Sequence, residues 1–207
     1  MAVRPILEIP HPALRQRARK IRNINSSILS LAYDMVDTMR EARGVGLAAN
    51  QVGVLKRLIV VQLPEEDEEA RIYINPEIVH REGEREVEEG CLSIPGYKGI
   101  ITRSVWVRFQ AMDHTSKLVK IKAEELLSQT IEHEVDHLNG ILYSDHLKEH
   151  EQLVPVSAEP EEEEGFGHEE ESASGAASPA APQEASGQSE LVGPAGGDEV
   201  PASLIIR

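Results

Sequence analysis

Two histidines in the second half of the chain are spaced so that they could bind one metal ion. The segment His133-Glu134-Val135-Asp136-His137 matches the pattern H-E-x-x-H. In a helix, residues four apart lie on one face about one turn apart, so both imidazoles could reach one cation. Glu134 would lie beside them, placed to take a proton from a metal-bound water. The motif predicts a hydrolytic metal centre; the alternative is an amphipathic helix with two exposed histidines.

A catalytic metal site usually has three protein ligands and one open position, so a third ligand is needed. Some metallopeptidases have a histidine six residues after the motif, but that position is Tyr143 here. The single cysteine, Cys91, lies in a Gly- and Pro-containing segment, which predicts a shaped loop rather than a core strand. A lone cysteine is most often a buried apolar residue. With the two histidines, however, its thiolate would complete a Cys-His-His ligand set with room for water.

A segment of small residues, GVGLAANQVG at residues 44–53, lies upstream of the cysteine. Glycine allows another chain to approach the backbone closely, so Gly44 and Gly46 could serve peptide binding. Gly44 could also end the preceding helix. Gln51 follows the glycines and could either donate hydrogen bonds within the site or be a surface amide.

The three segments together resemble the peptide deformylase family. EGCLS at 89–93 and HEVDH at 133–137, preceded by GVGLAANQ at 44–51, occur in the order typical of that family. The resemblance covers about residues 1–150. It implies removal of the formyl group from N-formylmethionine at the start of nascent polypeptides. It also implies one divalent metal ion, natively Fe²⁺, with Zn²⁺, Ni²⁺ or Co²⁺ able to substitute; the ligand set itself allows iron or zinc.

The resemblance implies a role for each motif residue. Cys91, His133 and His137 would hold the metal, and Glu134 would act as the general base. Gln51 and the backbone N–H of Leu92 would stabilise the oxyanion that forms at the formyl carbonyl. The family binds its peptide partly as an added strand. The substrate-binding backbone would then be that of Gly44, Val45, Gly46 and Leu47.

Other polar residues near the motifs have less certain roles. Glu89 and Asp136 could orient the ligands or could form a structural salt bridge. The methionine pocket could involve Leu92, Ile131 or residues 94–97, which sequence alone does not rank. The remaining histidines lack a partner motif and are expected at the surface: His11, His80, His114, His146, His150 and His168.

Hydrophobic spacing predicts the elements that must position these residues. Apolar residues at helical intervals predict an amphipathic helix over 26–42, and a second helix over 123–138 that carries both histidines. Alternating or continuous apolar runs predict strands at 57–63, 71–75, 77–80, 105–110 and 118–121, with Pro76 separating the second and third. A polar acidic loop is expected at 64–70. The order predicts an α+β fold, with antiparallel strands packed around the metal-binding helix.

Charge divides the chain of 207 residues near residue 150. Residues 151–207 hold thirteen acidic residues and one basic residue, a net charge of −12 out of −15 for the whole chain. This segment is rich in Gly, Pro, Ser and Ala, and it lacks the apolar content that would offset the entropy of ordering it. We expect a catalytic domain at 1–150 and a disordered acidic tail at 151–207, either a solvating appendage or an interaction tail.

Composition also excludes several classes of protein. The chain is too acidic for a generic DNA or RNA binder, and one cysteine excludes an internal disulfide framework. No run suits a membrane span or a secretory signal, so a cytoplasmic setting is expected. The expected partner is the formylated nascent peptide. Ribosome contact is in doubt, because residues 142–149 lead into an acidic tail that ribosomal RNA would repel.

Three other functions compete with deformylation. A metallopeptidase also uses H-E-x-x-H, although the cysteine of EGCLS and the missing downstream histidine disfavour it. A catalytically silent binding module is disfavoured by the presence of both Glu134 and Gln51. A third alternative makes the acidic tail the functional part and the domain its carrier.

Overall fold

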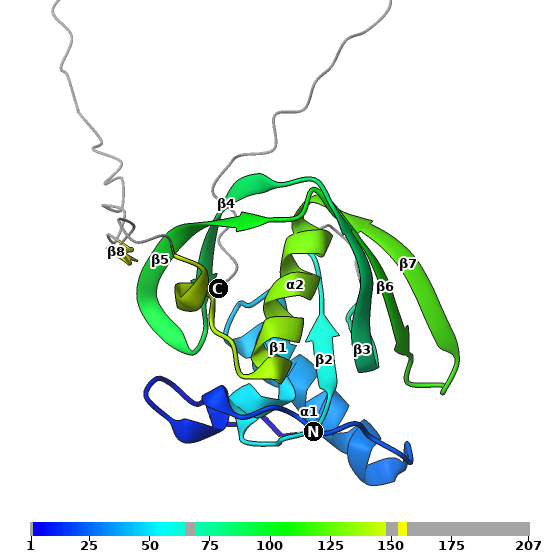
Figure 1. The fold of residues 1–207 in the computed structure, drawn as a ribbon. Coiled ribbons are helices and arrows are strands. Elements are labelled where there is room, and N and C mark those ends of the chain that lie inside the picture. The colour runs from blue at the N-terminus through cyan, green and yellow to red at the C-terminus, as the bar shows by residue number, and fades with distance from the viewer. Residues whose placement is uncertain (1, 65–68, 148–152, 157–207) are drawn as a thin grey trace, which may run out of the picture. The chain divides into compact units, whose positions relative to one another are not determined.

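The computed structural model describes residues 2–64, 69–147 and 153–156. Two antiparallel sheets and two α-helices make up the larger elements of these residues, as an α+β prediction requires (Figure 1). The first sheet has the order β1 (Gly46–Ala48), β2 (Leu58–Val61), β3 (Arg71–Glu82), β6 (Trp106–Met112), β7 (Leu118–Glu124). The second has the order β4 (Arg85–Cys91), β5 (Ile94–Arg103), β8 (Val154–Pro155). The helices are α1 (Ser26–Glu41) and α2 (Glu125–Asn139), with 3₁₀ turns η1 (Pro12–Arg15), η2 (Ala49–Val52) and η3 (Tyr143–His146).

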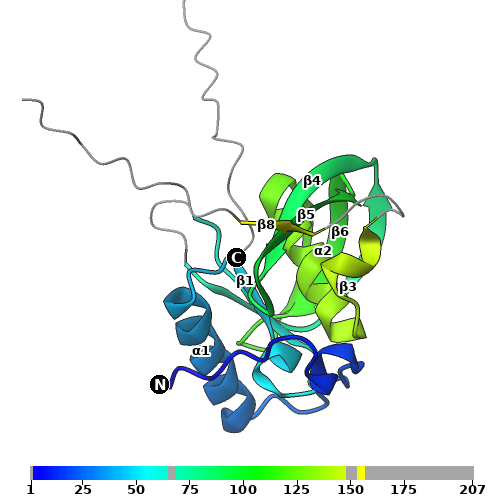
Figure 2. The ribbon, with the colours of Figure 1, turned by 90° about the vertical axis from the view of Figure 1, so that its left-hand side faces the viewer.

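The five-stranded sheet separates the two helices. Side chains alternate along β2, so Ile59 and Val61 contribute to the core on the α2 side, which also contains Ile131. Leu58 and Val60 contribute to the core on the α1 side. Figure 2 shows α1 away from α2, which lies beside β4 and β5. Because β2 is buried on both faces, its sequence is a continuous apolar run.

Helix α1 begins and ends through local hydrogen bonds. Its N-cap Asn25 accepts from the backbone N–H of Ile28 through its side chain, as Asn does at many helix starts. Sequence analysis allowed Gly44 to end this helix. The structure instead places Arg43 in the left-handed conformation (φ 55°), and the N–H of Gly44 donates to the carbonyl of Met39. The chain therefore leaves the helix one residue earlier than the glycine.

Helix α2 carries the H-E-x-x-H motif and starts two residues later than predicted. Ala123 and Glu124 still belong to β7, and the helix ends at Asn139 before Gly140 (φ 78°). A Cβ atom on Gly140 would lie 2.5 Å from the carbonyl oxygen of Arg15. Glycine is required there both by the positive φ and by the close contact with the N-terminal segment.

Two strand predictions were wrong. The predicted break at Pro76 is absent, because β3 runs through it and a register shift between Ile74 and Glu77 absorbs the missing N–H. The predicted loop around the cysteine is instead a hairpin of β4 and β5. Cys91 is the last residue of β4, and only Leu92 and Ser93 form the turn.

The structure describes only part of the predicted acidic tail, 151–207. Within the predicted tail, Val154 and Pro155 form β8, which pairs with Lys98 and Tyr97 of β5. Residues 157–207, the acidic positions 65–68 of the predicted loop and residues 148–152 lie outside the described residues. No helix among the described residues is both long and apolar enough to cross a bilayer.

Candidate metal centre

One cysteine and two histidines from distant parts of the sequence meet in the interior. The Sγ atom of Cys91 lies 3.1 Å from Nε2 of His137, which lies 3.2 Å from Nε2 of His133. Each residue offers one ligand atom, and these atoms lie within 4.8 Å of one another. All three side chains are buried. A thiolate and two imidazole nitrogens in this arrangement are donors that bind Fe²⁺ or Zn²⁺.

Helix geometry and the hairpin end create this arrangement. The two histidines lie four residues apart on α2, with ring centroids 4.9 Å apart. The register of the hairpin changes between Gly90 and Cys91, so Cys91 pairs with Ile94 across the two-residue turn. The backbone N–H of Ser93 donates to the cysteine sulfur at 3.4 Å. This bond helps to fix the position of the sulfur beside the two histidines.

A buried ion-pair network holds one of the histidines. Nδ1 of His133 lies 2.8 Å from Glu89 Oε2, which leaves Nε2 directed at the cysteine and the other histidine. Arg103 donates to Glu89 through Nε at 2.8 Å and through Nη2 at 3.1 Å. Burial raises the pKa of Glu89, but the hydrogen bond and charge of His133 and the charge of Arg103 outweigh burial and lower it to about 2.

The same network extends to the surface. Arg103 also donates to Asp136 Oδ2 through Nη1 at 2.6 Å, and Nε2 of the half-exposed His146 lies 2.8 Å from that oxygen. The two roles considered for Glu89 and Asp136, orienting a ligand and forming a salt bridge, are combined only in Glu89. Glu89 both contacts a candidate ligand and belongs to an ion pair, whereas Asp136 contacts Arg103 and His146.

Glu134 is fully enclosed beside the three candidate ligands. Its side chain is 1% exposed, and Oε2 has no hydrogen-bond partner among the described residues. Burial raises the pKa of Glu134 to about 7, because the charge of His133 lowers it less than burial raises it. A carboxyl group whose pKa lies near neutrality is suited to accept and return a proton. The Glu134 carboxyl group can lie against strand β1 because Gly46 has no side chain that would occupy the same space.

Gln51 belongs to η2, directly after β1, and is also buried. Its Oε1 accepts from the backbone N–H of Ala48 at 2.7 Å, which fixes the direction of the amide. Its Nε2 lies 3.8 Å from Cys91 Sγ and donates to Ser93 Oγ at 3.2 Å. The surface alternative for Gln51 is therefore wrong, since its N–H₂ group is directed at the metal-centre cysteine.

Comparison with known proteins gives a consistent result. A family model described as polypeptide deformylase matches residues 3–153. The peptide deformylase of Dehalococcoides mccartyi is 48% identical over 161 residues, which cover 78% of this chain and 96% of the relative. The chain belongs to the polypeptide deformylase family. The family model spans all three sequence motifs and every residue of the centre.

Solved deformylase structures share the fold. The peptide deformylase from Legionella pneumophila is 43% identical with a TM-score of 0.69, covering 72% of this chain and 88% of its own. The Met-Ala-Ser-bound peptide deformylase from Acinetobacter baumannii is 31% identical with a TM-score of 0.66. That match covers 70% of this chain and 99% of the other.

The other residues expected at the site of this deformylase-family chain lie in the hairpin turn, in and before β1, and in the core. Leu92 lies in the hairpin turn, and its backbone N–H makes no hydrogen bond within the described residues. Gly44 and Val45 lead into β1, which includes Gly46 and Leu47 and, among the described residues, pairs with β2 alone. Ile131, considered for the methionine pocket, is fully buried in the core that α2 shares with the sheet.

The other histidines behave as expected where the structure describes them. His11, His80, His114 and His146 are exposed, and His150 and His168 lie outside the described residues. Sequence analysis missed the contact of His146 with Asp136 and the part played by Arg103. No motif marks either residue, since each joins the network only through tertiary contacts.

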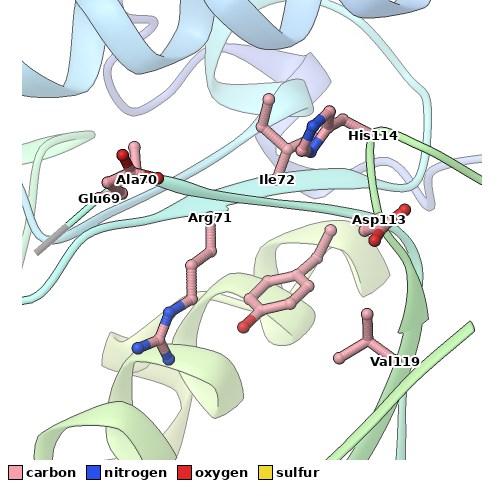
Figure 3. Close-up of a pocket in the computed structure, with 8 residues that line it drawn as sticks. Glu69, Ala70, Arg71, Ile72, Asp113, His114 and Val119 are labelled. Atoms are coloured by element: carbon pink, nitrogen blue, oxygen red, sulfur yellow. The ribbon is translucent and has the colours of Figure 1, made fainter. Parts of the chain in front are cut away.

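A separate cavity of about 410 Å³ lies between β3 and the turn that joins β6 to β7 (Figure 3). Figure 3 shows Arg71 directed to one side of the strand and His114 to the other. None of the motif residues lines this cavity. We assign it no part in the metal centre.

Proposed function

We propose that this chain removes the N-formyl group from the N-terminal formylmethionine of nascent polypeptides and releases formate. The observation that carries the proposal is the convergence of Cys91, His133 and His137 beside the buried Glu134. Family membership supports the same activity. The relative from Acinetobacter baumannii is bound to Met-Ala-Ser, a peptide that begins with methionine.

The residues present fit a catalytic metal. Cys91, His133 and His137 would hold one divalent ion, which supplies a Lewis acid and lowers the pKa of water when bound. We propose Fe²⁺ as the native ion, with Zn²⁺, Ni²⁺ or Co²⁺ able to replace it. The tautomer that Glu89 imposes on His133 leaves Nε2 free for this role.

The protein groups around the ion have separate tasks. Glu134 accepts a proton from the attacking water and delivers it to the amine that leaves as the C–N bond breaks. The Nε2 group of Gln51 and the backbone N–H of Leu92 donate to the oxyanion that forms on the formyl carbonyl. The fixed orientation of the Gln51 amide supports this task, because preorganised donors need no rearrangement during the reaction.

The peptide would bind along the strand that precedes Gln51. Gly44, Val45, Gly46 and Leu47 would pair with the substrate backbone at the edge of β1 that faces away from β2. We further propose that residues 1–150 form the catalytic domain and that 151–207 are a tail, with Val154 and Pro155 attached to β5. Deformylation would then not require the tail beyond that attachment.

Formate release tests this function. Anaerobically purified, iron-loaded protein is assayed with formyl-Met-Ala-Ser, with acetyl-Met-Ala-Ser and with a peptide lacking a formylated terminus. Formate should be released from the first substrate alone, without cleavage of internal peptide bonds. Internal cleavage would instead support a metallopeptidase, which the comparisons do not favour.

The Glu134→Ala variant completes the test. Activity should fall by about 10²–10⁴-fold, because proton transfer is lost, while metal content per chain stays unchanged. Activity like that of the wild type would remove Glu134 from the mechanism.

A further inference from the structure

A second cavity lies on the side of α2 that carries Val135 and Asn139. It measures about 490 Å³ and is bordered by the N-terminal segment, the start of β2, and β3. Positions 135 and 139 lie two residues after the metal-centre histidines, so they project from the other side of the helix. The cavity is therefore separate from the candidate metal centre.

Positive side chains dominate the lining of this cavity. Arg17, Lys20, Arg57 and Arg81 border it, and Glu77 is the one carboxylate among its described lining residues. Arg81 donates through Nε to Oε1 of Glu132, a second carboxylate, at 3.0 Å. Four positive groups thus face two negative groups, which leaves a surplus of two positive charges.

Arg57 is the buried member of this set. It is 9% exposed, and its guanidinium donates to Oδ1 of Asn139 at 2.9 Å and to the carbonyl of Pro76 at 3.1 Å. Both acceptors are uncharged, and no carboxylate oxygen of the described residues lies within 4.0 Å of its nitrogens. Buried charges in proteins are normally paired. Within the described residues this guanidinium is held by uncharged acceptors and forms no ion pair.

The electrostatics agree with an unmatched positive charge. Burial lowers the pKa of Arg57, the charge of Arg17 lowers it further, and Glu77 only partly opposes them. Arg17 and Lys20 are exposed, and neither forms an ion pair within the described part of the chain. Their flexible side chains can therefore close over a ligand that reaches Arg57.

We propose that this cavity binds a dianionic phosphate group, either as the free ion or carried by a small organic molecule. A phosphate monoester has a charge of about −1.5 to −2 at neutral pH, which matches the surplus of two. Arginine presents paired N–H donors that suit phosphate oxygens. The cavity volume is in the range of small-molecule sites, and Ala18, Ile78 and Val135 provide apolar lining for an organic part.

Calorimetric titration of the full-length, metal-loaded protein tests this site. The probes are inorganic phosphate and adenosine monophosphate, each at constant ionic strength. We expect saturable binding of at least one probe with one site per chain. Tighter binding of the nucleotide would identify an organic phosphate as the source, and equal binding would identify the ion alone.

Charge-removing variants locate the binding. The Arg17→Gln/Lys20→Gln double variant should bind the probe at least about tenfold more weakly, since its two changes remove cations from the cavity. Arg22→Gln is the matched control, because Arg22 is exposed in the same segment and does not line the cavity. The affinity of Arg22→Gln for the probe should differ from that of the wild type by less than about twofold.

Two results would overturn the proposal: no saturable binding of either probe, or equal affinity in the double variant and the control. If the double variant gave the same binding heat as the wild type, the probe would be binding at another site, such as the metal centre. Formate release should be the same in all three proteins, because none of these residues belongs to the deformylation site. Failure of this proposal would therefore leave the proposed function untouched.

Discussion

Gly46 and Glu134 are in such close contact that residue 46 has no room for a side chain. A Cβ atom there would lie 2.5 Å from Oε1 of Glu134 and 2.9 Å from Cγ2 of Thr130. The proposed substrate-binding strand and the proposed base are thus positioned against each other. Any side chain at residue 46 would displace the carboxylate.

The Gly46→Ala variant should therefore lose activity while remaining folded. A displacement of about 1 Å at a catalytic group can cost about 10²-fold in rate, and we expect a loss of kcat/KM of that order with unchanged metal content. Formate release, circular dichroism and metal analysis check this. Gly99→Ala is the control, because its Cβ would lie 2.9 Å from a flexible leucine methyl group of Leu147. Equal losses in both variants would mean that the contact with Glu134 is unimportant.

The Gln51→Ala variant should lower kcat by about 10²–10³-fold, the usual effect of removing one oxyanion donor. Stability should fall by only about 1 kcal/mol, because the variant also loses the bond from Ala48 to Oε1. Ser93→Ala is the matched control, since it removes the acceptor of Gln51 Nε2 and keeps the amide. A Gln51→Ala rate within a few-fold of normal would contradict the assigned role.

Arg103→Leu should destabilise the fold and weaken metal binding together. The change leaves Glu89 and Asp136 buried without their cation, which typically costs about 3–5 kcal/mol. Metal affinity should fall by about 10–100-fold, because Glu89 no longer holds His133 firmly. Urea unfolding and metal titration measure the two effects. His146→Ala removes only the half-exposed end of the network and should cost less than about 1 kcal/mol.

Acid should weaken the attachment of the N-terminal segment to α1. The backbone N–H of Ala2 and the Arg4 side chain donate to Asp34, and these bonds lower the pKa of Asp34 below its ordinary value of 3.8. A lowered folded-state pKa means that the stabilisation is complete above the ordinary value and is lost as the pH falls below it. Asp34→Asn should therefore lower the urea midpoint at pH 7 and show less further loss at pH 3.

Asp37→Asn, on the same helix, controls for the loss of a carboxylate. The Asp37 side chain forms no ion pair within the described residues. The urea midpoint of Asp34→Asn could instead fall between pH 7 and pH 3 as much as that of the wild type. That result would show that Asp34 does not contribute to the loss of stability in acid.

The sequence predicted the metal-centre histidines because helical spacing is a local property. His133 and His137 must share a face once α2 forms, and apolar residues mark that helix clearly. The contact with Cys91 is not local, so the residue type could only suggest it as a third ligand, and the resemblance to a family supported that choice. The end of α1 was also predicted inexactly. Arg43 adopts the left-handed conformation there, whereas the adjacent Gly44 is the more typical residue for a helix end.

The hairpin of β4 and β5 was missed because its buried positions are not all apolar. Glu89 is completely buried, yet it reads as a surface residue in the sequence. Arg103 makes that burial possible from the far end of β5, and nothing in the linear pattern pairs the two. Pro76 led to the opposite error: it predicted a break where the strand is continuous, because a register shift within β3 accommodates the proline.

Strand β1 has one edge without a neighbouring strand among the described residues. Where amides and carbonyls along such an edge pair with a peptide, they contact its main chain, which is common to every protein. A ligand held in this way is recognised by its backbone and its first residue, whatever sequence follows. One such surface can therefore serve a whole proteome of different N-termini.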